Sequence, residues 1–282
     1  MKILIPSKCR PDTIRTHKWL EKYGLDYKII LHDNQERNDY LKNNTIDPAK
    51  IIVSGAPKCL PAQREWMTTN LCEMGEWAIF LDDNISGFTA AQEDYYKKEC
   101  LENDTKNFDN VKYNSVLSRQ ITALEFLEIC DEMKEIGIKK RAFLCGFATT
   151  DNPLFRNKKF KYYSYVIGKA IIRKRTQIKY PETWYCQEDY YDMASHLLHF
   201  GKVLVNNFAR PISKHYEQGG IGDYDSRLPK KIQLNAKLME HFPGLFRYNQ
   251  KVNCPKEAEI ILRLNTENQI EKWRTWMLTR KP

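Results

Sequence analysis

Two pairs of adjacent carboxylates are the residues of this chain best suited to chemistry. Asp82 and Asp83 follow residues 77–81 (Trp-Ala-Ile-Phe-Leu), an apolar run with the length and composition of a buried strand. Carboxylates at the C-terminal end of a strand lie where an open α/β sheet binds its ligands. Like charges repel, so a cation or a hydrogen-bonding ligand between them is favoured. The simplest occupant is a divalent metal carrying a diphosphate, with a ribose hydroxyl alongside. An acidic turn after a core strand is the alternative.

The second pair is Glu188 and Asp189, at the start of residues 188–200, which are predicted to form a helix. The helix dipole favours acids in the first turn, so capping is one interpretation. The other is a general base that takes a proton from an attacking hydroxyl. Aromatic neighbours would raise the pKa of such a carboxylate by desolvation, which suits a base.

Three polar clusters follow predicted strand ends in the N-terminal half, at residues 7–10, 32–34 and 82–84. In a parallel sheet these ends converge on one edge, so the clusters can jointly hold one nucleotide. Arg64 lies in a predicted helix before the acid-bearing strand. Its guanidinium can bind a phosphate through two hydrogen bonds, or pair with a neighbouring acid at the surface. His215 is either a ligand to a divalent metal or an ordinary surface or core residue.

Strands and helices alternate along the first half of the chain, which predicts a mostly parallel sheet with helical crossovers. Strands are predicted over residues 2–6, 27–31, 50–53, 77–81, 141–149, 162–173 and 202–208. Helices are predicted over residues 13–23, 61–74, 122–136 and 188–200. Residues 92–118 are polar and read as an excursion from the core. The predicted fold class is α/β, a central sheet flanked by helices with a helical C-terminal extension over residues 230–282.

Positive charge is concentrated in residues 154–180, here called the basic segment. The chain has 45 basic and 36 acidic residues, a net charge of +9, whereas the basic segment contains no acid. Aromatic residues are interleaved with its lysines and arginines, a pattern typical of a polyanion site. A solvated basic hairpin over aromatic packing is the alternative. The residues expected to contact nucleic acid are Lys158, Lys159, Lys161, Arg173, Lys174 and Arg175.

Composition indicates a globular protein of one large domain or two small ones. Hydrophobic residues make up 42% of the chain and aromatic residues 12%, and no apolar run approaches the roughly 20 residues that span a bilayer. The N-terminal apolar run is too short for a secretory signal, so we expect an intracellular protein without a membrane partner. The eight cysteines form no Cys-x-x-Cys pair, which indicates free thiols in a reducing compartment.

Taken in order, these motifs resemble a GT-A-fold glycosyltransferase. The order is an Ile-Leu-Ile-Pro-Ser strand, Arg64, the Leu-Asp-Asp-Asn strand end, Glu188-Asp189, and His215 before Gly219-Gly220. More narrowly, the chain is similar to the glycosyltransferases associated with TET and J-base-binding oxygenases, phage and eukaryotic enzymes thought to glycosylate hydroxymethylated pyrimidines in DNA. The resemblance covers roughly residues 1–225. It implies a Rossmann-like GT-A domain over residues 1–229, with the basic segment on the acceptor side.

The resemblance also implies a divalent metal, Mn²⁺ or Mg²⁺, and a UDP-sugar donor. Asp82 would contact the ribose or base, whereas Asp83 would bind the metal and His215 would complete the metal site. Many GT-A enzymes have a third carboxylate where Asn84 stands here, which leaves the ligand set open.

Other residues receive roles by the same resemblance. Asp189 or its neighbour Glu188 would be the base of an inverting transfer. The nucleotide pocket would be lined by Ser7, Arg10, Asp33 and Arg64.

The implied reaction transfers glucose or a pentose such as arabinose to the hydroxymethyl group of 5-hydroxymethylcytosine in phage DNA. It would take place in the cytoplasm of the infected host cell. Two other functions are compatible with the sequence: transfer to a glycan or a protein, and a non-catalytic nucleic-acid-binding α/β module. Oligomeric state and the choice between cytosine and uracil derivatives are left open.

Overall fold

The fold was analysed in a computed structural model of the chain. The structure describes residues 1–43, 45–91, 118–150, 158–184, 186–213, 224–249 and 255–280. The predicted excursion at 92–118 therefore lies outside the described residues except for Ser118. No helix among the described residues has the length and apolar character needed to cross a membrane.

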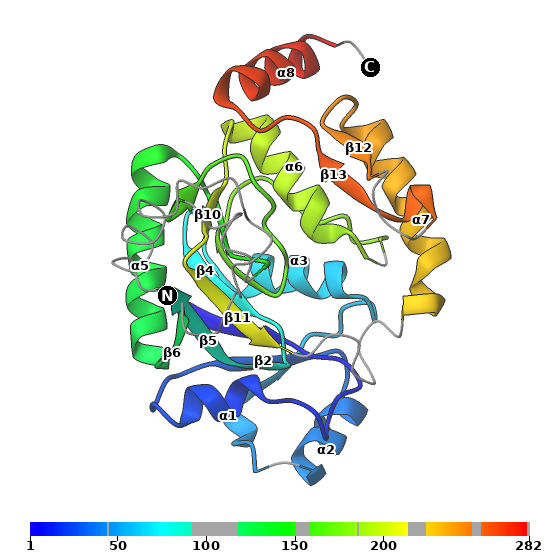
Figure 1. Ribbon diagram of the computed structural model, residues 1–282. Coiled ribbons are helices and arrows are strands. Elements are labelled where there is room, and N and C mark those ends of the chain that lie inside the picture. Colours follow the sequence, from blue (N-terminus) through cyan, green and yellow to red (C-terminus); the bar gives the residue numbers. More distant parts are fainter. Residues whose placement is uncertain are drawn as a thin grey trace, which may run out of the picture.

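An eight-stranded mixed sheet forms the centre of the molecule, in the order β3-β2-β1-β4-β9-β7-β10-β8 (Figure 1). Its strands are β1 (Lys2–Pro6), β2 (Lys28–Leu31), β3 (Ile51–Val53), β4 (Trp77–Leu81), β7 (Leu144–Phe147), β8 (Phe160–Lys161), β9 (Ala170–Lys174) and β10 (Leu204–Asn206). Only β8 and β9 run antiparallel to their neighbours. The carboxyl ends of the other six strands therefore share one edge of the sheet.

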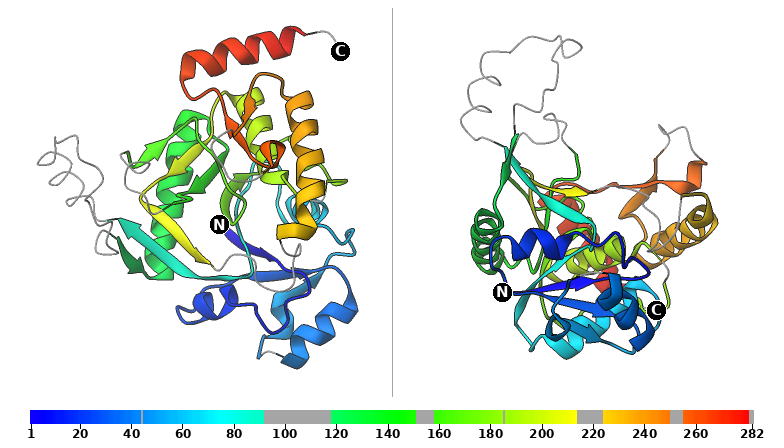
Figure 2. Two further views of the ribbon diagram at one scale, coloured as in Figure 1. Left: turned by 45° about the vertical axis from the view of Figure 1, so that its right-hand side comes forward. Right: turned by 90° about the horizontal axis from the view of Figure 1, so that it is seen from below.

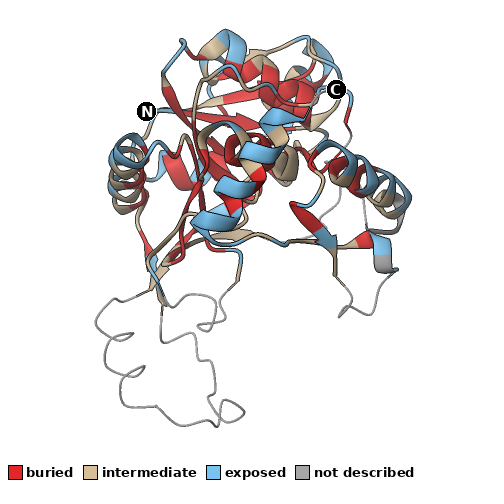
Figure 3. Ribbon diagram, turned by 90° about the horizontal axis from the view of Figure 1, so that it is seen from above, coloured by how far each residue is buried: buried red, intermediate tan, exposed pale blue. Residues whose placement is uncertain are grey.

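Helices cover both faces of this sheet, as the alternation of side chains along β1 requires. Ile3 and Ile5 pack into one buried cluster with Phe126, whereas Leu4 packs into the other with Met67 and Leu197. Figure 1 shows α5 on one side and α3 and α6 on the other, and Figure 3 shows buried residues gathered in the centre with exposed residues on the outer helices. The principal helices are α1 (Thr16–Glu21), α2 (Asn34–Asn43), α3 (Leu60–Leu71), α5 (Ala123–Lys140) and α6 (Glu188–Phe200).

A second, three-stranded sheet continues directly from the acid-bearing strand. It has the order β11-β5-β6, with β5 at Ile85–Ala91, β6 at Ser118–Ile121 and β11 at Ala209–Ser213. The C-terminal part contains α7 (Tyr224–His241), the β12–β13 pair (Phe246–Tyr248 and Ile260–Leu262) and α8 (Glu267–Thr279). Figure 2 shows α7 and this pair together at one side of the molecule.

The structure confirms the predicted fold class: an α/β protein with a mostly parallel central sheet, flanking helices and a largely helical C-terminal extension. Within the extension the β12–β13 pair was not predicted. The helix α2 was not predicted either.

Two further differences concern the second half. Helix α5 continues through Gly137 to Lys140, and its C-cap residue is Arg141, whose φ is +59°. The helix was predicted to end just before Gly137. In the structure this glycine allows close packing, because a Cβ there would lie 2.8 Å from Trp77. The predicted strand 162–173 is wrong in its first part: pairing is limited to β8 and β9.

Candidate active site at the carboxyl edge of the sheet

Asp83 is held by residues that follow the neighbouring strand β1. Its carboxylate accepts a hydrogen bond from Ser7 Oγ and lies 2.6 Å from Arg10 Nη1. The Ser7 hydroxyl is also 2.6 Å from the hydroxyl of Tyr40 in α2. Burial raises the pKa of Asp83 although Arg10 opposes the shift. Ser7, Arg10 and Asp83 therefore come together at one edge of the sheet, as expected for residues that follow neighbouring parallel strands.

Asp82 faces a different set of groups. Its side chain is 28% exposed, and its carboxylate lies 3.3 Å from Arg64 Nη2. Its backbone N–H donates to the carbonyl of Lys169 at 2.7 Å. Burial raises the pKa of Asp82 to about 6, with Asp83 adding to the rise and Arg64 opposing it. Adjacent in sequence, the two carboxylates thus point into separate polar surroundings.

Arg64 connects the two acidic pairs from inside the protein. It is 1% exposed, and its Nη1 donates to Glu188 Oε1 at 2.8 Å. Its Nη2 donates to the carbonyl of Gly168 at 2.5 Å in addition to the Asp82 contact. Both terminal nitrogens therefore have protein partners, so Arg64 does not present a fork to a phosphate as the sequence suggested. Its ion pair is buried where helix α3 packs against β1.

Glu188 and Asp189 differ in accessibility. Glu188 is buried, and desolvation raises its pKa to about 7, with Asp189 adding to the rise against Arg64. Asp189 is half-buried and accepts hydrogen bonds from the backbone N–H of Gly168 at 3.1 Å and of Tyr190 at 2.9 Å. Burial also raises the pKa of Asp189. Asp189 is the acid of this pair that solvent can reach.

The raised pKa of Glu188 predicts a pH-dependent contribution to stability. Between its ordinary pKa of 4.5 and the folded value of about 7, the folded state binds more protons than the unfolded state. Stability therefore falls as pH rises through this window. Glu188→Gln should reduce this fall, measured as the free energy of urea unfolding at steps from pH 4.5 to 7.5. Profiles for the variant and the wild type that stay parallel would contradict the assignment.

One predicted site residue lies apart from this cluster, and another is outside the described residues. Asp33 lies at the surface after β2, where it pairs with Lys58 at 2.6 Å and accepts from the backbone N–H of Glu36. These contacts lower its pKa. Asp33 therefore caps α2, and no contact joins it to Asp83 among the interactions described. His215 lies outside the described residues.

The basic segment does not form a single surface. In the register of β4 and β9, Leu81 pairs with Ala170 and Trp77 with Lys174. Lys174 and the following Arg175 therefore lie at the edge opposite the acids. There the ammonium of Lys174 is 4.5 Å from the Phe143 ring. The backbone N–H of Arg175 donates to the carbonyl of Glu76.

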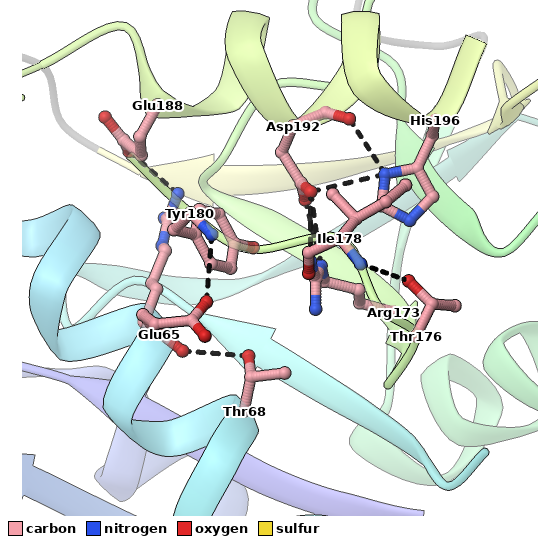
Figure 4. Close-up of polar contacts among 10 residues, drawn as sticks. Glu65, Thr68, Arg173, Thr176, Ile178, Tyr180, Glu188, Asp192 and His196 are labelled. Carbon is pink, nitrogen blue, oxygen red and sulfur yellow. Dashed lines mark hydrogen bonds and ion pairs between the residues drawn. The ribbon is translucent and has the colours of Figure 1, made fainter. Parts of the chain in front are cut away.

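Arg173 was predicted to contact nucleic acid, but the structure buries its side chain. Its side chain is 0% exposed, and its Nε lies 3.0 Å from Asp192 Oδ2 (Figure 4). Asp192 also pairs with His196 at 3.2 Å. Arginine at this strand position points into the core, between β9 and α6, so it is a structural residue and does not face a polyanion.

Part of the basic segment does line a surface pocket. Lys158 is exposed and Lys161 half-buried, and the pKa of Lys161 is lowered by desolvation and by Lys158. Lys159 pairs with Glu132 at 3.0 Å. The pocket has a volume of about 560 Å³ and is lined by Lys158, Phe160, Lys161, Tyr162, Tyr163, Ser164, Tyr165, Leu262 and Asn265. It is here called the aromatic-lysine pocket.

Asp82 and Asp83 differ in how well they fit a divalent metal ion. Among the described residues, no group of three His, Cys, Asp or Glu side chains is arranged to hold a metal. Asp83 already has Ser7 and Arg10 as partners and is buried. Asp82 is the more exposed carboxylate and its pKa is raised, so a cation would favour its ionised form. Asp82 fits a divalent cation better than Asp83 does.

Several residues of the site were missed from sequence. Tyr40 contacts Ser7 from an unpredicted helix, and Gly168 accepts from Arg64 and donates to Asp189. Lys169, whose carbonyl accepts from the Asp82 N–H, lines a pocket together with Arg210. Of these residues, only Lys169 could have been noticed in the sequence, because it belongs to the basic segment.

Comparisons with known proteins add no evidence on the function of the chain. No protein-family model matches the chain, and no curated protein matches it. A solved structure of S. aureus TarS, residues 1–349, is similar to it with a TM-score of 0.38 and 11% sequence identity. The alignment covers 99% of this chain and 71% of that one. The function proposed below therefore depends on the site's own residues.

Proposed function

We propose that the protein is a glycosyltransferase that uses a nucleoside diphosphate sugar. The observation that supports this most is the convergence of two acidic pairs on the carboxyl edge of the sheet, joined through Arg64. This edge is where open α/β sheets bind nucleotides. One pair follows β4 and the other begins α6, so a ligand between them meets acids from two directions.

The nucleoside is expected on the Asp83 side of the site. Ser7 and Tyr40 are buried around that carboxylate, and Arg10 is the partly exposed group there that a ribose or a base would reach. We take UDP as the nucleotide, following the GT-A resemblance. Asp33 is expected to act through α2 and not by direct contact.

The divalent cation, Mn²⁺ or Mg²⁺, is proposed to bind Asp82, with His215 as its second protein ligand. This exchanges the roles that the sequence resemblance gave to the two acids. When bound, the cation would stabilise the charge that develops on the diphosphate as the glycosidic bond breaks. This assignment is supported by the different surroundings of the two acids. Asp83 is buried and lies 2.6 Å from Arg10, whereas Asp82 is 28% exposed and lies 3.3 Å from Arg64.

Asp189 is proposed as the general base, because it is half-buried while Glu188 is fixed by Arg64. The acceptor oxygen forms a bond to the anomeric carbon, and the bond from that carbon to the diphosphate oxygen breaks. The acceptor hydroxyl proton passes to Asp189. The backbone N–H groups of Gly168 and Tyr190 orient its carboxylate, and burial raises its pKa toward a value useful for a base.

The acceptor is proposed to be the hydroxymethyl group of 5-hydroxymethylcytosine in DNA. The aromatic-lysine pocket supports this, because it offers tyrosines on which a base can stack and lysines that attract phosphate. A glycan or protein acceptor is the second candidate. It is supported by the positions of three basic residues, because Arg173 is buried and Lys174 and Arg175 lie at the opposite edge of the sheet.

Neutralising the aromatic-lysine pocket should discriminate between these acceptors. Lys158→Gln with Lys161→Gln removes two cations, so binding to duplex or single-stranded DNA should weaken. The slope of log K against log salt should become shallower by about 1 to 2. Fluorescence anisotropy at several salt concentrations measures this slope. The matched control is Lys139→Gln with Lys140→Gln, two exposed lysines at the end of α5. Equal slopes for both double variants would favour the glycan or protein acceptor.

The activity itself is tested by incubation with Mn²⁺, a panel of UDP-sugars and hydroxymethylcytosine DNA. Mass spectrometry of the digested nucleosides reports the mass added to the base. A folded sample that transfers no sugar to DNA, while hydrolysing or transferring a donor to another acceptor, would reject the DNA acceptor. Failure to bind UDP by calorimetry would reject the glycosyltransferase itself.

A further inference from the structure

A small pocket lies beside the acid-bearing strand, and the reaction outlined above does not use it. It has a volume of about 230 Å³. This is below the roughly 300–1,000 Å³ of pockets that hold a whole ligand, so it suits one chemical group. The lining residues are Phe147, Ala148, Thr149, Ile167, Lys169, Ala170, Arg210, Pro211 and Ser213.

Two cations share this otherwise largely apolar pocket. Lys169 and Arg210 are both half-buried, and Lys169 Nζ donates to Ser213 Oγ at 2.8 Å. The two cations are close enough to repel each other. Two like charges brought together away from bulk water are stabilised by an anion between them.

The pocket adjoins both acidic pairs through the backbone. The carbonyl of Lys169 accepts from the N–H of Asp82 at 2.7 Å. The preceding residue, Gly168, donates its N–H to Asp189. A sugar held between the diphosphate and the base would therefore have the pocket at its side.

We propose that Lys169 and Arg210 form an anion subsite that binds a carboxylate or phosphate carried by a substrate next to the transferred sugar. This rests on the proposed function, and it defines the substrate class of the same site. The anion has two possible sources: the carboxylate of a uronic acid donor, or a phosphate that flanks the acceptor hydroxyl. The Thr149 and Ser213 hydroxyls add hydrogen-bonding groups beside the two cations.

The test compares Arg210→Met with the wild type in two binding titrations. The donor arm measures the Kd of UDP-glucuronate and of UDP-glucose. The acceptor arm measures the Kd of a hydroxymethylcytosine trinucleotide and of the free nucleoside, which lacks phosphate. Arg119→Met is the matched control, because it removes one positive charge from β6 of the same small sheet, outside the pocket. Melting temperatures confirm that both variants are folded.

A carboxylate subsite predicts that Arg210→Met weakens UDP-glucuronate about 10- to 100-fold and leaves UDP-glucose unchanged. A phosphate subsite predicts the same loss for the trinucleotide only, beyond any loss in Arg119→Met. If neither charged ligand loses affinity relative to its neutral counterpart, the subsite is rejected while UDP binding still supports the glycosyltransferase. If UDP itself does not bind, the proposed function fails, and this outcome is distinct from the first.

Discussion

Asp189→Asn should reduce sugar transfer about 10²- to 10⁴-fold while leaving the nucleotide bound. The substitution keeps the size and one hydrogen-bond acceptor of the side chain but removes its ability to take the acceptor proton. The Gly168 and Tyr190 N–H groups donate to different carboxylate oxygens, so the asparagine keeps one of these two hydrogen bonds at the start of α6. Turnover of labelled donor at saturating concentration measures kcat, and calorimetry measures the Kd of UDP.

Glu188→Gln is the matched control for this effect. It is the neighbouring acid, but it is buried against Arg64 and is not expected to meet the acceptor. Its loss in kcat should therefore be much smaller than that of Asp189→Asn. If Glu188→Gln lost more kcat than Asp189→Asn, with UDP binding intact in both variants, Glu188 would be the general base. A full loss of UDP binding in Asp189→Asn would show a structural defect and contradict the proposed role.

Arg173→Met should lower the free energy of unfolding by about 3–5 kcal/mol. The variant leaves the carboxylate of Asp192 buried without its guanidinium partner, and removing one member of a buried pair has a cost of this size. Both side chains are at most 1% exposed, so water cannot replace the lost contact. Urea denaturation of the purified protein at neutral pH measures the change.

The double variant Arg173→Met, Asp192→Leu separates charge from packing. Replacing both members of a buried ion pair with apolar side chains is often close to neutral. We therefore expect the double variant to recover more than half of the stability lost in Arg173→Met. A single variant within about 1 kcal/mol of the wild type would instead place Arg173 at the surface, as the sequence alone suggested.

The first half of the fold was predictable because its pattern is local. Residues 2–6 and 77–81 are apolar runs of strand length, and they form β1 and β4. The convergence of Ser7, Arg10 and Asp83 then followed from parallel strand order alone. Helix α2 was missed because its sequence is mostly polar, and it buries only Glu36 and Tyr40.

The direction of individual side chains was not predictable. Arg173 and Lys174 are neighbours of the same charge type, yet the pleat of β9 turns the first into the core and leaves the second half-exposed. Arg64 reads as a surface cation until its partners from α6 and from Gly168 are known, and these are more than 100 residues away. Such contacts depend on tertiary packing, which the local pattern of a single sequence does not encode.

The backbone around Gly168 constrains how the family of this chain can vary in length. Its carbonyl binds Arg64, its N–H binds Asp189, and the next carbonyl binds the N–H of Asp82. A Cβ at this position would lie 2.5 Å from Arg64 Nη1. An insertion or deletion here would shift three polar anchors at once. Homologues should therefore accumulate gaps in other connections and keep both the spacing to β9 and a residue without a side chain at this point.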